Sequence, residues 1–108
     1  MQLSQAEITQ QNNQKYLISG VVDFMTTPEL MLSAARLLIS GAKAAEKKVL
    51  VDMSQVTDCN SAGLALMLEM EKQARASKID LHFENIPDTL LTIAKAYGVE
   101  NEIRDICK

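Results

Sequence analysis

The chain has 108 residues, of which 47% are hydrophobic, and its 14 acidic and 11 basic residues leave a formal net charge of −3. This length predicts one domain, residues 1–108, around a single core. The interspersed charges exclude a basic surface for nucleic acid or anionic lipid, and no apolar run is long enough to span a bilayer. The start of the chain lacks a signal-peptide layout, so we expect a cytoplasmic location.

Cysteine and histidine are scarce in this chain. Cys59 and Cys107 are the only cysteines, and His82 is the only histidine. Such a set matches neither a disulfide framework nor a metal site, and free thiols suit a reducing compartment. We therefore expect no metal.

The first part of the chain predicts a hairpin followed by a helix. Residues 6–9 and 15–22 are strand-like and flank a polar turn at 11–13. The next helix starts with a capping hydroxyl, a proline and an acid, namely Thr27, Pro28 and Glu29. Its apolar pattern is lost within the segment 41–48.

The second part alternates strands and helices. We expect a buried strand at 49–53, a helix at about 62–76, a strand at 81–85 and a helix from 87 or 88. Gly98 stands where a left-handed residue would end that last helix. One face of the last helix is apolar and carries Leu90, Ile93, Ala94 and Tyr97.

The predicted order is therefore β-β-α-β-α-β-α. The opening hairpin is antiparallel, and the two later strand–helix–strand crossovers require parallel neighbours with right-handed connections. This is a mixed α/β fold with a small mixed sheet and helices mainly on one face. A short fifth strand near the N-terminus or the tail stays open.

The sequence offers little for catalysis. His82 lies inside a predicted strand, where a structural role is far more common than a general base. Cys59 precedes a helix N-terminus, which would lower a thiol pKa, but no partner base is evident. The glycines follow neither the dinucleotide nor the P-loop pattern. We therefore expect no catalytic residue, no cofactor and no enzymatic activity.

The central stretch VLVDMSQVTDCNSAGLALML is similar to the signature of STAS domains, the fold of bacterial anti-sigma-factor antagonists. Asp52, Met53 and Ser54 match the end of the family's strand, and residues 60–64 match the opening of its helix. SGVVD at 19–23 and IPDTLLTIAKAYGV at 86–99 resemble two further family segments. The resemblance implies a sheet of four to five strands with about three helices.

Within this family, GLAL and IAKAYGV are most similar to the STAS subunits of Mla-type ABC transporters. These transporters move phospholipids to maintain outer-membrane lipid asymmetry. The likeness implies a non-catalytic accessory subunit that binds and supports the cytoplasmic ATPase subunit. The complex would also contain a permease and an MCE lipid-binding subunit. The chain would then lie at the inner membrane only indirectly, through its partner.

The resemblance also points to Ser61, at the mouth of the second predicted helix. Taken without the resemblance, this serine is a helix cap that contributes roughly 1 kcal/mol to the stability of the fold. A helix mouth can equally hold an anion or phosphate. In the family the matching hydroxyl has a contact or regulatory role. The alternative function is thus an anti-sigma-factor antagonist switched by phosphorylation at Ser61.

Three polar neighbours bear on that alternative. Asn60 stands where sigma-pathway antagonists carry an aspartate, which weakens the phosphorylation reading. The family resemblance implies that Asp23 lies close to Ser61 as a supporting group, although an acid at a strand end also favours the following turn. Asp52 is the second supporting group.

The second helix has more apolar residues than one packing face requires. Gly63, Leu66 and Met67 belong to one stripe, whereas Leu64 and Leu68 lie beside it. Surplus apolar residues predict either a docking patch or cover by a neighbouring helix. We expect an exposed strip of Ser61, Leu64 and Leu68, within a partner site of Asn60, Ser61, Ala62, Gly63, Leu64 and Leu68.

Overall fold

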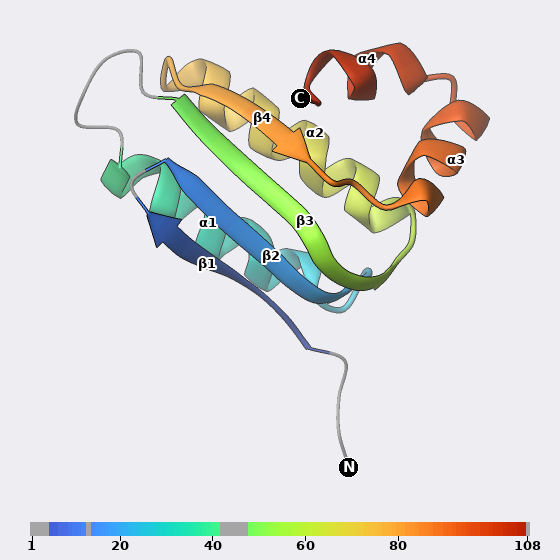
Figure 1. The fold of residues 1–108 in the computed structure, drawn as a ribbon, viewed down its shortest axis with the longest axis horizontal. Helices are drawn as coiled ribbons and strands as arrows, with labels where there is room; N and C mark the ends of the chain where they lie inside the picture. Colours follow the sequence, from blue (N-terminus) through green and yellow to red (C-terminus); the bar gives the residue numbers. More distant parts are fainter. Residues whose placement is uncertain (1–4, 13, 42–47, 108) are drawn as a thin grey trace.

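A computed structural model describes residues 5–12, 14–41 and 48–107. The sheet has the order β1-β2-β3-β4, with β1 antiparallel to β2 and the other neighbours parallel. This is the mixed α/β fold that the sequence predicts (Figure 1). The elements are β1 (Ala6–Asn12), β2 (Lys15–Val22), α1 (Thr27–Gly41), β3 (Lys48–Cys59), α2 (Ser61–Ala76), β4 (Asp80–Glu84), α3 (Asp88–Ala96) and α4 (Glu100–Asp105).

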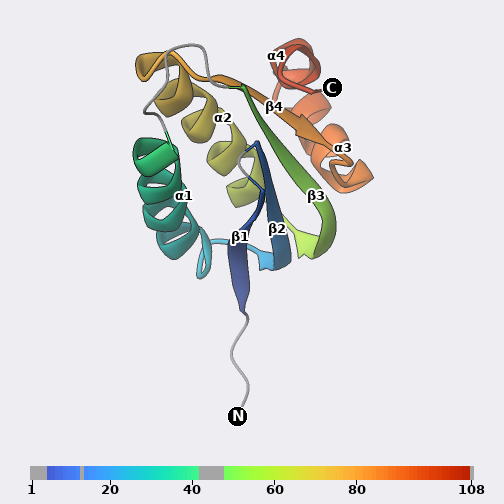
Figure 2. The same cartoon turned by 60° about the vertical axis from the view of Figure 1, so that its left-hand side comes forward.

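The helices are distributed unevenly around the sheet. α1 and α2 lie side by side on one face, and α3 and α4 lie beyond β4, at the edge opposite β1 (Figures 1 and 2). Alternation along the strands turns Tyr16, Val51 and Phe83 into the core between sheet and helices, where each is almost fully buried. Lys15, Asp52 and other polar residues occupy the opposite, uncovered face.

β3 is longer than the sequence predicted. The apolar run ends at Met53, but pairing with β2 continues to the partners Val22 and Cys59. The added residues are mostly exposed and polar, so hydrophobicity gave no sign of them. Hydrogen bonding to β2 maintains the strand through two register irregularities.

The sequence did not predict α4, and the tail after this helix adds a minimal strand. The six residues of α4 contain one buried side chain, Ile103, which is too little for a helical period to be recognised. Beyond it, the Phe83 N–H donates to the Ile106 carbonyl at 2.8 Å, and Cys107 bridges β4 in parallel. The fifth strand that the sequence left open is thus a single bridge at the tail.

Two glycines have the positive φ that favours this residue. Gly98 ends the turn after α3 with φ +74°, as predicted. Gly20, with φ +93°, lies where β2 passes the start of β1, and a Cβ there would stand 2.2 Å from the Gln5 carbonyl oxygen. Separately, none of the helices in the described part of the chain is long and apolar enough to cross a membrane.

Candidate functional site

The mouth of α2 is built where β2 and β3 end together. Asn60 has extended backbone angles, and its side-chain oxygen accepts a hydrogen bond from the Ala62 N–H at 2.9 Å. Its own N–H donates to the Val22 carbonyl at 3.2 Å, which ties the mouth to the end of β2. Asn60 is therefore the N-cap of α2.

Ser61 is the first helical residue and is half-buried. Its hydroxyl has no hydrogen-bond partner within residues 5–12, 14–41 and 48–107. The interpretation of Ser61 as the cap is wrong, because the side-chain oxygen of Asn60 accepts the hydrogen bond from the Ala62 N–H at this helix end.

Asp23 stands beside this mouth but is engaged elsewhere. It directly follows Val22, whose carbonyl binds the Asn60 N–H. Its Oδ1 accepts hydrogen bonds from the Met25 and Thr26 N–H groups, at 2.9 and 3.1 Å. This is the turn-forming role of an acid at a strand end, and Asp23 makes no direct bond to Ser61.

Three residues expected in a partner site are instead packed inside. Ala62 and Gly63 are buried, and Leu64 is only 4% exposed. A Cβ on Gly63 would meet the Leu90 Cδ2 at 3.2 Å, so α3 approaches α2 closely here. The prediction that Leu64 is exposed is wrong, because its side chain belongs to the buried core cluster.

Leu68 remains partly accessible, but it does not form a strip with Leu64. It packs against the core at one side and lines a hollow of about 510 Å³ between α2 and α4. Ile106 lines the same hollow, together with charged residues of both helices. Only Ser61 and Leu68 of the predicted strip therefore contribute to the surface.

The sequence reasoning missed an apolar surface on the other flank of α2. Phe24 and Met25, in the turn before α1, are 69% and 81% exposed. A hollow of about 210 Å³, which we call the α1–α2 groove, is lined by Phe24, Thr27, Met31, Ala62, Ala65, Leu66 and Glu69. Its sequence signal was available: two large apolar residues directly after an acid in a predicted turn.

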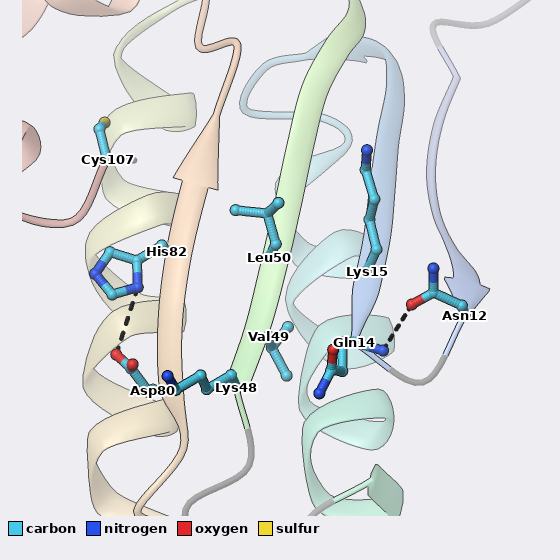
Figure 3. A pocket seen from close by; sticks show the side chains of 9 residues that line it. All are labelled: Asn12, Gln14, Lys15, Lys48, Val49, Leu50, Asp80, His82 and Cys107. Atoms are coloured by element: carbon cyan, nitrogen blue, oxygen red, sulfur yellow. Dashed lines mark hydrogen bonds and ion pairs between the residues drawn. The ribbon is translucent and has the colours of Figure 1, made fainter.

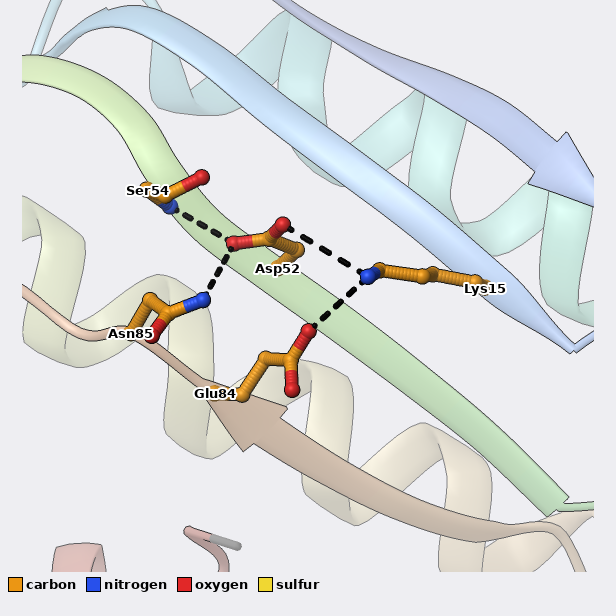
Figure 4. Close-up of polar contacts among 5 residues, drawn as sticks. All are labelled: Lys15, Asp52, Ser54, Glu84 and Asn85. Atoms are coloured by element: carbon orange, nitrogen blue, oxygen red, sulfur yellow. Dashed lines mark hydrogen bonds and ion pairs between the residues drawn. The ribbon is translucent and has the colours of Figure 1, made fainter.

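Asp52 belongs to a polar network on the uncovered face of the sheet (Figure 4). Its Oδ1 accepts from the Ser54 N–H at 2.8 Å and from the Asn85 amide at 3.1 Å. The Lys15 Nζ lies 3.8 Å from Asp52 Oδ2 and 3.1 Å from Glu84 Oε2. Because β3 continues well past Asp52, this carboxylate does not lie at the strand end beside Ser61.

The same network sets the charge state of Asp52. Burial alone would raise the pKa of this carboxyl, whose side chain is 13% exposed. The hydrogen bonds from Ser54 and Asn85 and the charge of Lys15 outweigh burial, so the pKa lies below its ordinary value. Asp52 is thus an ionised structural group.

One further cluster lies in a hollow of about 570 Å³ on the uncovered face (Figure 3). His82 Nδ1 is 3.4 Å from Asp80 Oδ1, and Cys107 lines the same hollow. The thiol lies apart from the imidazole and makes no hydrogen bond with it, and burial raises the pKa of Cys107. The arrangement therefore lacks the contact that would activate a cysteine nucleophile.

Cys59 is likewise poorly suited to reaction. Burial, followed by the charge of Asp58, raises the pKa of this thiol. The helix start beside it therefore does not produce a thiolate at neutral pH. Among the described residues, no three histidine, cysteine, aspartate or glutamate side chains are grouped so that they could hold a metal ion.

Comparisons with known proteins agree with the observed fold. The family model described as "Mlab, STAS domain" matches residues 9–106. Among solved structures, the chain is similar to the anti-sigma factor antagonist SpoIIAA in its unphosphorylated form, with a TM-score of 0.67 and 12% identity. That match covers 96% of this chain and 86% of the other, and at this identity it shows the fold alone. No curated protein sequence matches.

Proposed function

Because the chain belongs to the family of MlaB-type STAS domains, we propose that it is an accessory subunit of an Mla-type ABC phospholipid transporter. In this role it docks on the cytoplasmic ATPase subunit, supports that subunit, and catalyses nothing itself. The permease and the MCE lipid-binding subunit complete the complex. Contact with the inner membrane is then indirect, through the ATPase subunit.

One observation carries the docking proposal. The Ser61 hydroxyl stands at the mouth of α2 without a hydrogen-bond partner in the described part of the chain, and Asn60 caps the helix. Exposed apolar side chains, above all Phe24, lie on the flank beside it. A neutral hydroxyl beside apolar surface is suited to burial in a protein interface, where it can bond to a partner group.

The alternative is an anti-sigma-factor antagonist controlled by phosphorylation. The accessibility of Ser61 favours it, since a kinase needs to reach the hydroxyl. Asn60 argues against it: this position carries a neutral amide whose oxygen is committed to the Ala62 N–H. The accessory-subunit role therefore fits the site better.

Purification of the tagged protein from its native host, in mild detergent, separates the two functions. We expect the ATPase subunit, the permease and the MCE protein to co-purify, and intact-mass measurement to show Ser61 unmodified. Recovery of an anti-sigma kinase, with phosphate on Ser61, would establish the alternative instead. Genes for an ATPase, a permease and an MCE protein beside this one would support the first outcome.

A further inference from the structure

The α1–α2 groove has dimensions that favour a protein occupant. Its volume of about 210 Å³ falls below the roughly 300–1,000 Å³ typical of small-molecule sites. Apart from Thr27 and Glu69 its lining is apolar, and Phe24 at its end is 69% exposed. A groove of this kind accepts one large apolar side chain presented by another protein.

The two segments that contribute the lining of the groove carry charges of one sign. Segments 20–35 and 54–70 contain no lysine or arginine, whereas the rest of the chain holds all 11 bases and ten of the 14 acids. None of the four acids in these segments forms an ion pair with a described residue. We call them the acidic rim: Asp23, Glu29, Asp58 and Glu69.

One member of the acidic rim lines the groove, and a second adjoins it in the chain. Glu69 lines the groove, and Asp23 precedes Phe24 in the chain. Asp58 pairs with Val21 near the ends of β3 and β2. Glu29 shares a second hollow with Met25, on the same turn as Phe24. An apolar groove lined by Glu69, with Asp23 next to Phe24 and neither carboxylate in an ion pair with a described residue, is complementary to apolar surface flanked by basic residues.

The secondary structure around the groove selects the form of the occupant. Two helices form its walls, and their backbone groups are bonded within each helix, so an extended segment would find no strand edge to pair with. A helix satisfies its own backbone and can lie along α1 and α2. We propose that the groove binds an amphipathic helix of the partner, with one large apolar residue inserted and lysine or arginine facing the acidic rim.

This inference rests on the proposed function for the identity of the partner. The direct test is a titration of the purified protein with the ATPase subunit. Glu69→Lys should weaken binding at least tenfold and make the affinity depend less on salt concentration. The control Glu7→Lys makes the same change on β1 and should alter the affinity less than twofold. Ala65→Trp, which obstructs the groove from an exposed helical position, should also weaken binding at least tenfold, unlike Ala96→Trp on α3.

A photo-cross-linking amino acid in place of Phe24 identifies the occupant, and the same group at the exposed Tyr97, which directly follows α3, is the control. We expect the Phe24 adduct to contain a basic amphipathic helix of the ATPase subunit. If wild-type protein binds this subunit but Glu69→Lys and Ala65→Trp bind equally well, the inference fails and the proposed function stands. If the ATPase subunit does not bind, but the cross-linker at position 24 captures a basic amphipathic helix of another protein in host cells, the proposed function fails and the inference stands. The inference would be overturned if no adduct formed, or if the adduct contained a second copy of this chain or a peptide without basic residues.

Discussion

At the residue scale, the assignment of the helix cap can be measured. Asn60→Ala removes the side-chain acceptor for the Ala62 N–H and should lower the free energy of unfolding by about 1 kcal/mol. Ser61→Ala removes a hydroxyl that makes no hydrogen bond with the described residues and should stay within about 0.5 kcal/mol of wild type. Urea denaturation of both variants checks this. A larger loss for Ser61→Ala than for Asn60→Ala would mean that Ser61 is the cap after all.

Asp52 gives a pH-dependent prediction. Its pKa in the fold lies below the ordinary 3.8, so the stability that it contributes is present above that value and is lost as the pH falls through the lower, folded-state pKa. Asp52→Asn should therefore cost about 1 kcal/mol at pH 7, and its deficit should shrink as the medium is acidified below about pH 4. Denaturation at several pH values tests this, with the exposed Glu7→Gln as control. A deficit that does not change with pH would contradict it.

At the scale of elements, two leucines one turn apart on α2 differ in burial. Leu64 is buried in the core, so Leu64→Arg forces a charge into the core and should abolish the cooperative melt. Leu68 is partly accessible at the α2–α4 hollow, so Leu68→Arg should keep a cooperative melt. Circular dichroism on heating distinguishes the pair. Loss of folding in Leu68→Arg would place this residue in the core and remove it from the docking surface.

Close packing of α2 against α3 leads to a fourth stability prediction. In Gly63→Ala, the gain in helix propensity of about 1 kcal/mol opposes a tight contact with Leu90, so the net change should be small. Gly63→Leu has no space and should lose roughly 1–3 kcal/mol or more. Chemical denaturation measures both variants. Equal stability of Gly63→Leu and wild type would mean that the helices do not approach as closely as described.

At the scale of the whole molecule, α4 closes the fold at the β4 edge. Ile103 is completely buried, so Ile103→Ala should cost about 2–5 kcal/mol, whereas the neighbouring exposed Glu102→Ala should change stability by less than about 0.5 kcal/mol. Equilibrium unfolding of the two variants tests this. Similar small effects would show that α4 is dispensable for the core.

The order of the first seven elements could be predicted because capping residues, apolar runs and Gly98 signal each of them locally. Leu64 shows the limit of that reasoning, since periodicity within α2 does not reveal that residues beside its main apolar stripe are also buried. α4 and the exposed half of β3 lack an apolar signal and are maintained by packing and by pairing with β2. At the candidate site, the resemblance identified Ser61, but only the fold brings Phe24 and Ala65 together in one groove.

The central claim is that the mouth of α2 docks on an ATPase subunit through a neutral hydroxyl. A titration of the ATPase subunit with wild type, Ser61→Ala and Ser61→Asp tests it most directly. We predict that wild type binds, that Ser61→Ala binds within a few-fold of it, and that Ser61→Asp binds at least tenfold more weakly because an unpaired charge is buried. Equal binding by wild type and Ser61→Asp would contradict the claim.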